Sequence, residues 1–419
     1  MIETFKNAFK IKEVRNKILF TLLFVVLYRL GCFIPVPGLN FSSIAGQFEQ
    51  ANIFNLLNSV TGSALSQGTI FAIGISPYIN ASIIIQLLTV AIPSLERMSK
   101  EGEEGKAKIE KITRWVTLAL AIISAVGILF AFQNAASGQS GSIIDPNFFG
   151  EWLSNVDWLV FVYASIVLVG GSMLCMWIGE RITEYGISNG ISVLIFVGIL
   201  STAFNGIFKT IGEIPTNISR LWELLGFLAT SLLVFAFIVW VNGAERKIKV
   251  QYAKQVKGNK MYGGQSTFIP IKVNASGVMP LIFAFAILSF PSMLIETFWK
   301  GSDFGIWWAQ YMGNGTIVYT IVLAILIFVF SYFYSQIQFN PLEISKNIQQ
   351  NGGFIPGIRP GRETSEYLSK VVSRITFWGA VFLAIIALIP SLIFGLVTSN
   401  NSYLITAFSA TGMLIVVSV

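Results

Sequence analysis

The sequence predicts an all-α membrane protein with about ten transmembrane helices. Its 419 residues are 54% hydrophobic and only 12% charged, whereas a soluble domain carries roughly 25% charged residues. The apolar residues gather in long charge-poor runs, and about 20 such residues are enough to cross a hydrocarbon core of ~30 Å. Lysine and arginine cluster in alternate connections between these runs, which is typical of a multi-pass protein.

Ten apolar runs are candidate spans, and an even number places both termini on the same side of the membrane. They lie near 18–36, 70–92, 115–134, 157–178, 189–208, 221–241, 275–296, 315–335, 374–394 and 403–419. Leu323, in the eighth run, is expected to face lipid.

The basic residues support this number of spans. All but four of the 28 lysines and arginines fall in the regions that ten spans place beside the N-terminus, namely 1–17, 93–114, 179–188, 242–273 and 336–374. The exceptions are Arg29, Lys209, Arg220 and Lys300. Because positive residues resist translocation, these five regions and the N-terminus are predicted to be cytosolic.

The basic N-tail, residues 1–17, has two interpretations. Ile2, Phe5 and Phe9 lie among its lysines and suggest an amphipathic helix lying on an anionic leaflet. A disordered basic tail fits equally well.

Enzyme chemistry is not predicted. The chain has no histidine, which removes the commonest general base and zinc ligand. The two cysteines, Cys32 and Cys175, are expected to be free thiols, and no phosphate-binding glycine loop is present. We therefore expect no catalytic residues, no metal and no cofactor.

An unusual segment lies between Glu49 and Glu96, where the sequence holds no charge. Its first part, residues 54–68, is rich in Asn, Ser and Gly. Lipid would leave these polar groups unsatisfied, so the segment should be buried in protein or line a wet cavity. An ordinary external loop is the alternative.

The loops 242–273 and 336–374 are much longer than a connection between spans requires. Topogenic charge explains their lysines but not their length. The glycines and proline of residues 357–361 predict turns that would hold Arg359 at a defined tip. Such loops suggest docking to an acidic or RNA-containing partner.

From the residues alone, an ion-coupled secondary transporter is one candidate function, and a non-transporting membrane scaffold is another. Transporters place ionisable residues near the membrane midplane, but the predicted span interiors are almost free of charge. The spans instead contain small and neutral polar residues such as Gly74, Asn80 and Gly277. These residues fit either ordinary helix packing or a separable, partly wet interface.

The sequence resembles the bacterial SecY family over essentially its whole length. The matching stretches are FIPVPG (33–38), GISPYINASIIIQLL (74–88), GERITE (179–184), GISNGIS (186–192), QSTFIPIKVN (265–274) and FIPGIRPG (354–361). The resemblance implies a clamshell of two pseudo-symmetric five-helix halves, 18–208 and 221–419, around an hourglass pore, joined by an external hinge loop at 209–220.

The resemblance also assigns residues to this pore. The constriction ring would be Ile75, Ile79, Ile191, Ile195, Ile282 and Ile415. Stiff apolar side chains in a ring can exclude water and ions by dewetting without binding a passing peptide. From the residues alone, these isoleucines would be interpreted as lipid-facing or core.

Three further sets follow from the same resemblance. A plug near 54–68 would include Asn55, Leu56, Leu57, Asn58, Ser59, Thr61, Gly62 and Leu65. The lateral gate, between the second and seventh spans, would include Asn80, Gln86, Asn274 and Ser276. Docking of the SecA motor ATPase or the ribosome would use Arg246, Lys247, Lys254, Lys257 and Arg359.

The implied function is a protein-conducting channel in the bacterial plasma membrane. It would pass unfolded secretory polypeptides across the bilayer and release signal or transmembrane segments laterally into lipid. The implied partners are the small membrane subunits SecE and SecG, SecA, the ribosome and secretory preproteins. Members of this family continue into a short cytosolic tail, whereas the present sequence ends at Val419.

Overall fold

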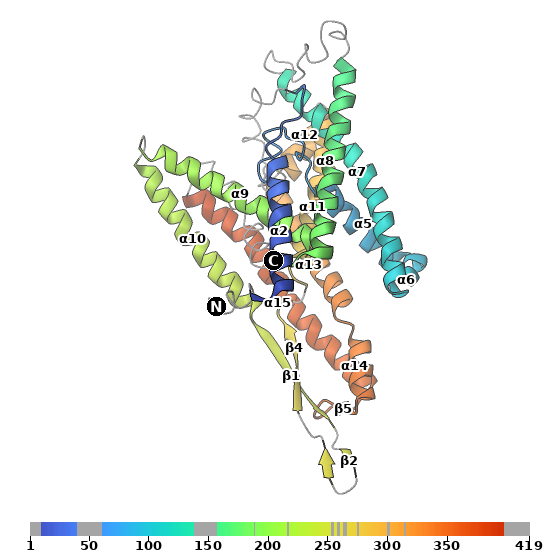
Figure 1. Ribbon diagram of the computed structural model, residues 1–419. Helices are drawn as coiled ribbons and strands as arrows, with labels where there is room; N and C mark the ends of the chain where they lie inside the picture. Colours follow the sequence, from blue (N-terminus) through green and yellow to red (C-terminus); the bar gives the residue numbers. More distant parts are fainter. Residues whose placement is uncertain are drawn as a thin grey trace.

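The computed structural model is mostly helical (Figure 1). It describes residues 10–39, 61–137, 157–187, 189–215, 218–252, 255–257, 260–262, 266–274, 276–299, 302–313 and 316–397. The helices in this part of the chain are α2 (Lys12–Gly31), α5 (Ser76–Ala91), α6 (Pro93–Lys100), α7 (Glu103–Ser137), α8 (Asp157–Tyr185), α9 (Gly190–Glu213), α10 (Ser219–Asn242), α11 (Met279–Phe298), α12 (Asp303–Met312), α13 (Ile317–Gln338), α14 (Pro341–Gln350) and α15 (Arg362–Val397).

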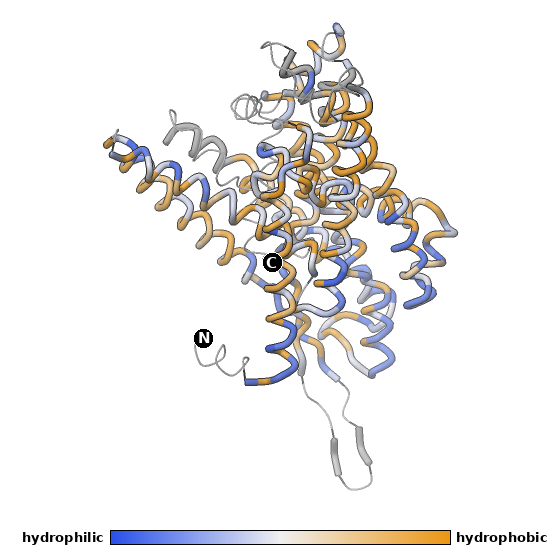
Figure 2. The backbone as a smooth tube through the Cα atoms, turned by 45° about the horizontal axis from the view of Figure 1, so that its top comes forward, coloured by the Kyte–Doolittle hydropathy of each residue, from blue (hydrophilic) through white to orange (hydrophobic). Residues whose placement is uncertain are grey.

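Nine of the ten predicted spans coincide with described helices, and the tenth, 403–419, lies outside the described residues. Within the described part, six helices are long and apolar enough to cross a membrane, or seven if α5 and α6 form one broken span. Helix α2 and the shorter apolar helix α11 occupy the remaining two positions. Figure 2 shows hydrophobic residues along the middles of the helices and hydrophilic residues at their ends.

Proline and glycine explain where several helices differ from the predicted spans. Helix α2 ends at Gly31 because Pro35 and Pro37 follow closely. Helix α5 bends by 101° into α6 at Ile92. Ile92 has an extended backbone, because the following Pro93 disfavours a helical conformation at this residue. Residues 12–17 of the predicted basic tail form the start of α2, and residues 1–9 lie outside the described part.

The connection between α9 and α10 is shorter than the predicted hinge loop, 209–220. Helix α9 continues to Glu213 and α10 begins at Ser219. Arg220 forms ion pairs with Glu213 at 3.3 Å and Glu223 at 2.9 Å, which joins the two helix ends. The helices project together to one side of the molecule (Figure 1).

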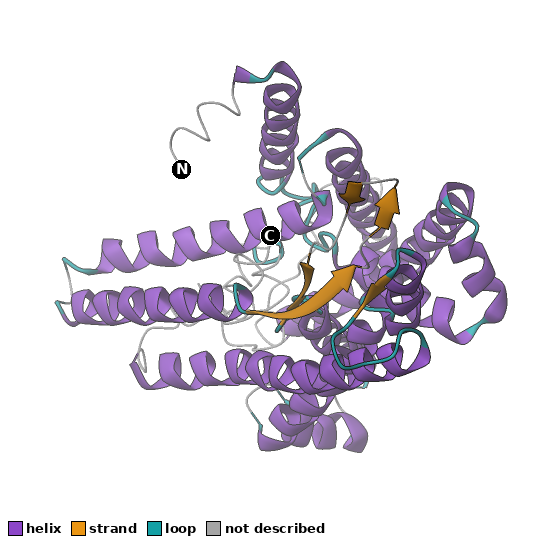
Figure 3. Ribbon diagram, turned by 90° about the horizontal axis from the view of Figure 1, so that it is seen from below, coloured by secondary structure: helices purple, strands orange, loops and turns teal. Residues whose placement is uncertain are grey.

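The two long basic loops form one folded unit. Strand β1 (Glu245–Tyr252) pairs antiparallel with β4 (Ser266–Lys272), and its other edge pairs with β5 (Gly353–Phe354) from the second loop. The short strands β2 (Gln255–Lys257) and β3 (Lys260–Tyr262) form a separate hairpin. Figure 3 shows the strands in view from below, at one end of the helices.

A small core of its own holds this unit together. Ile248, Val250 and Ile271 of the sheet pack with Ile348 of α14 and Leu368 of α15. We call this unit, residues 245–272 with 341–372, the sheet–helix module. The alternating apolar residues of β1 are typical of a strand with one buried face.

Helix α13 corrects one expectation. Leu323 is only 3% exposed and belongs to the core between α10, α11, α13 and α15, so the prediction that it faces lipid is wrong. Ile325, two residues further on, is 56% exposed. The helix is apolar all round, and its sequence therefore does not distinguish the buried face from the exposed one.

Candidate functional site

Helices α5, α9 and α11 meet at an apolar cluster that contains the predicted ring residues. Ile75 and Ile195 are 4% and 5% exposed within this cluster. Ile79, Ile191 and Ile282 are half-buried and pack against the same cluster. The structure thus brings together five of the six predicted isoleucines, and Ile415 lies outside the described residues.

Close packing of α8 against α9 positions one side of the cluster. A Cβ atom at Gly190 would lie 2.0 Å from the carbonyl oxygen of Gly179, so only glycine fits at this contact. A Cβ atom at Gly179 would lie 3.3 Å from Cγ1 of Ile191 and 3.5 Å from Cδ1 of Ile75. Asn189 caps α9, because its side-chain oxygen accepts a hydrogen bond from the backbone nitrogen of Ile191 at 3.1 Å.

The described end of the predicted plug, residues 61–68, lies beside this cluster together with the residues that follow it up to 75. It consists of turns and is buried, with Thr61, Leu65 and Thr69 each 1% exposed. The backbone nitrogen of Val36 donates to the carbonyl of Gly68 at 2.9 Å, and that of Ile70 donates to Ile34 at 3.0 Å. Protein therefore covers this polar part of the chain, as the sequence predicted.

Three predicted plug residues, Thr61, Gly62 and Leu65, belong to this buried segment. The other five, Asn55, Leu56, Leu57, Asn58 and Ser59, lie outside the described residues. The backbone of the described plug residues forms turns. Position 62 requires the conformational freedom of glycine, because its φ is +66°.

A small cavity with a mixed polar and apolar lining lies where α5, α7 and α11 meet. Ser76 and Asn80 of α5, Ser124 of α7 and Ser289 of α11 contribute its polar groups, and Leu65 of the plug segment is one of its apolar residues. Its volume of about 30 Å³ is enough for a water molecule. Asn80, a predicted gate residue, thus lies at the junction of the two halves.

The other predicted gate residues have different surroundings. Tyr334 of α13 donates a hydrogen bond to Oε1 of Gln86 on α5 at 2.5 Å, and this bond joins the two halves of the molecule. Asn274 and Ser276 are buried before the start of α11. The Asn274 side chain donates to Asn242 at the end of α10 at 3.1 Å, a contact within the C-terminal half.

The predicted docking residues lie on the sheet–helix module. Arg246 and Lys247 of β1 are exposed, and the side chain of Arg359 is 87% exposed. The turn around Arg359 is held by glycines with φ of +85° and +102° at Gly357 and Gly361. Thr364 also donates to the Arg359 carbonyl at 2.7 Å.

The two remaining docking residues are less fully described. Lys257 belongs to β2, whereas Lys254 lies outside the described residues.

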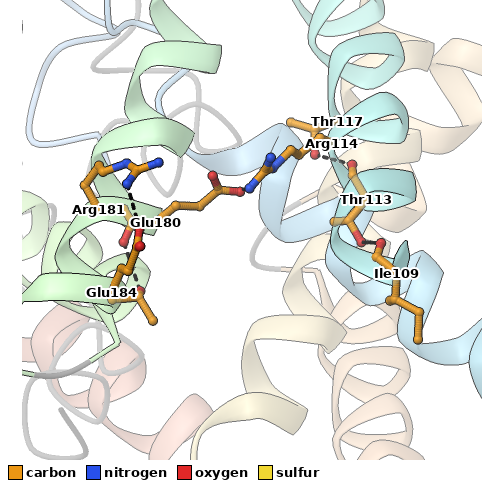
Figure 4. Close-up of polar contacts among 9 residues, drawn as sticks. Ile109, Thr113, Arg114, Thr117, Glu180, Arg181 and Glu184 are labelled. Carbon is orange, nitrogen blue, oxygen red and sulfur yellow. Dashed lines mark hydrogen bonds and ion pairs between the residues drawn. The ribbon is translucent and has the colours of Figure 1, made fainter. Parts of the chain in front are cut away.

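Figure 4 shows a polar contact that sequence reasoning did not single out. Nε of Arg114 on α7 donates to Oε1 of Glu180 on α8 at 2.9 Å. Arg181 pairs with Glu184 one turn further along α8. These charged groups pair near the end of α8, although Nε of Arg181 is buried without a hydrogen-bond partner. Within the described residues no cluster of three or more His, Cys, Asp or Glu side chains could hold a metal ion.

The arrangement defines a class of multi-helix membrane protein with an apolar cluster where its two halves meet. The profile of the SecY family matches residues 69–419. Protein translocase subunit SecY of Thermus thermophilus is 41% identical, over 100% of this chain and 93% of the relative. The SecY of Streptomyces scabiei is 39% identical, over 100% and 95%.

The chain belongs to the SecY family. Solved structures share its fold at lower identity. One is a protein-conducting channel with a TM-score of 0.67 at 20% identity, covering 96% of this chain and 89% of the other. Another is Sec61 in a canine ribosome–channel complex, with a TM-score of 0.62 at 19% identity and the same coverage.

Proposed function

We propose that the chain is the channel-forming subunit of a protein translocase, which passes unfolded polypeptides across a membrane and releases apolar segments sideways into lipid. The observation that carries this proposal is the convergence of Ile75, Ile79, Ile191, Ile195 and Ile282 on one apolar cluster beside a buried polar segment. Family membership supports it independently, because the curated relatives are protein translocase subunits.

The five isoleucines would form the constriction with Ile415. Their branched side chains present a stiff apolar collar in which water is unfavourable, so ions are excluded without a charged barrier. An extended peptide that passes between these side chains is not retained, because they offer it no hydrogen bond and no charge. A collar of this kind conducts polypeptides of any sequence.

The buried segment that includes Thr61, Gly62 and Leu65 would be part of the plug. It packs beside the isoleucines through Ala64, and displacement of this segment would leave the collar open on that side.

The seam between α5 and α11 would be the lateral gate. A partly polar cavity at Asn80 lies in this seam, and a hydrogen bond from Tyr334 of the neighbouring α13 to Gln86 of α5 helps to hold the two sides of the gate together. Asn274 and Ser276 would support the C-terminal side of the gate through the base of α11.

Partners would dock at the sheet–helix module. Exposed arginine and lysine at Arg246, Lys247 and Arg359 suit an acidic protein surface or RNA phosphates, and we assign Lys254 and Lys257 to the same surface. We propose the SecA motor and the ribosome as these partners, with SecE and SecG as membrane subunits. The chain itself would catalyse no reaction.

We place the protein in a bacterial plasma membrane with its N-terminus in the cytosol. The bacterial relatives and the asymmetric distribution of lysine and arginine support this placement. The alternative of an ion-coupled transporter is not supported, since the matching family consists of translocase subunits.

Reconstitution tests the proposal. Vesicles that contain the purified complex, supplied with the motor ATPase and ATP, should protect a secretory preprotein from added protease, and vesicles without the complex should not. The proposal would be contradicted if no preprotein were protected. If the same vesicles then took up a small solute in response to a proton or sodium gradient, the transporter would be supported instead.

A further inference from the structure

Arg29 is the one charged residue inside the first apolar run, and the proposed function gives it no role. It lies in the last turn of α2, at the end opposite the basic N-tail. A positive charge at this end opposes the topology that the other basic residues favour. Ionisable residues within a membrane are costly and usually serve a specific contact.

The contacts of Arg29 reach two other parts of the molecule. Its Nη1 donates to the carbonyl oxygen of Gly62 at 3.4 Å, and its Nη2 donates to the hydroxyl of Ser201 on α9. The guanidinium carbon lies 5.5 Å from the centre of the Phe33 ring. Within the described residues these contacts are to a carbonyl, a hydroxyl and a ring rather than to a carboxylate.

The backbone of Gly62 fits tightly into this position. A Cβ atom there would lie 2.5 Å from Nη1 of Arg29 and 3.2 Å from Cα of Gly198 on α9. Gly198 and Ser201 lie three and six residues beyond Ile195 on the same helix. At 1.5 Å per residue this is about 5–9 Å from the level of Ile195. Arg29 therefore meets the plug segment just past the proposed constriction.

We propose that Arg29 is a positioning residue that fastens the plug segment to α9 in the closed channel. Its charged guanidinium donates one hydrogen bond to the Gly62 carbonyl and one to the Ser201 hydroxyl, and so links the plug segment to α9. The turn conformation of residues 61–75 leaves backbone carbonyls that need donors, and Arg29 supplies one. This inference rests on the proposed function, because it assigns a role within the same channel.

The charge matters more than the shape of the side chain. When the plug moves away, the guanidinium of Arg29 loses its hydrogen bond to Gly62. It keeps its hydrogen bond to Ser201, and water can then hydrate it in the open pore. A neutral side chain at position 29 loses the charged donor to the Gly62 carbonyl in the closed state and has little to lose in the open state. Neutralisation should therefore favour the open state, whereas a purely structural role would reduce folding and activity together.

The test compares Arg29→Gln with the unaltered protein as purified complexes in vesicles and planar bilayers. Resting ion conductance should rise about tenfold, the change expected for the loss of a hydrogen bond to a charged group. Translocation of a preprotein with a defective signal sequence should rise as well, while translocation of a normal preprotein is retained. Arg15→Gln, which removes an exposed charge near the start of the same helix, is the matched control and should change neither.

Ser201→Ala provides a second variant that keeps the charge and removes one acceptor. It should shift both readouts in the same direction by a smaller factor, and the double variant should not exceed Arg29→Gln alone. If Arg29→Gln fails to accumulate, Ser201→Ala decides the question.

The role of Arg29 would be overturned if Arg29→Gln, or Ser201→Ala in its place, showed the resting conductance and the signal selectivity of the unaltered protein. Failure of the unaltered complex to translocate a normal preprotein would instead overturn the proposed function.

Discussion

The hydrogen bond between Tyr334 and Gln86 should help to keep the proposed lateral gate closed. It joins α13 to α5 at 2.5 Å, and Tyr334 is only 7% exposed. Tyr334→Phe removes the hydroxyl and keeps the ring, which packs against Phe283 with centroids 4.8 Å apart. Because Gln86 is exposed, its oxygen can find another partner after the substitution.

The size of the effect follows from this geometry. Hydrogen bonds between membrane helices stabilise by about 0.6 kcal/mol on average and at most ~1.7 kcal/mol. The smaller figure corresponds to a roughly threefold shift toward the open gate. A preprotein with a weakened signal sequence depends most on gate opening, so its translocation rate relative to a normal preprotein should rise about threefold.

Tyr332→Phe is the matched control. The hydroxyl of Tyr332 donates to the carbonyl of Ser373 at 3.4 Å, which is a contact within the C-terminal half. Its loss should leave the rate ratio unchanged. Gln86→Leu should reproduce the effect of Tyr334→Phe, and the double variant should add nothing. An unchanged or lower ratio in Tyr334→Phe would refute the reasoning.

Three further outcomes are expected. Arg359→Ala should reduce motor-driven translocation at least tenfold without changing the melting temperature, while Arg362→Ala, an exposed arginine that pairs with Glu366, should have a smaller effect. Leu368→Ala should destabilise the sheet–helix module by about 2–5 kcal/mol, because Leu368 is fully buried, and hydrogen exchange in β1 and β4 should accelerate. Gly190→Ala should lower the melting temperature because of its clash with α8, whereas Gly212→Ala, which has open space around its Cβ position, should be neutral or slightly stabilising.

Patterns within single segments predicted much of the fold. Apolar runs located nine described helices, and the turn around Arg359 followed from the glycines and proline beside it. Helix ends were less accurate, because α7 and α15 continue past the apolar runs into charged sequence. The bend at Ile92 also depends on a local conformation that an apolar run does not reveal.

Contacts between distant segments were not predictable in the same way. Strand β5 joins β1 across about a hundred residues, and β5 is too short to show an alternating pattern. The buried face of α13 was missed because every face of that helix is apolar. The ring isoleucines came from the family resemblance, since branched apolar residues one turn apart also occur in cores and on lipid-facing surfaces.

The most direct test of the central claim is photo-crosslinking from Ile79. A photoreactive residue at this position should crosslink to the mature part of a stalled secretory precursor, because Ile79 packs at the proposed constriction. The same residue at Ile325, an exposed position on α13, should give no such crosslink. If Ile79 gives none in a folded complex with its membrane partners present, the polypeptide does not pass between these helices and the proposed pore is wrong.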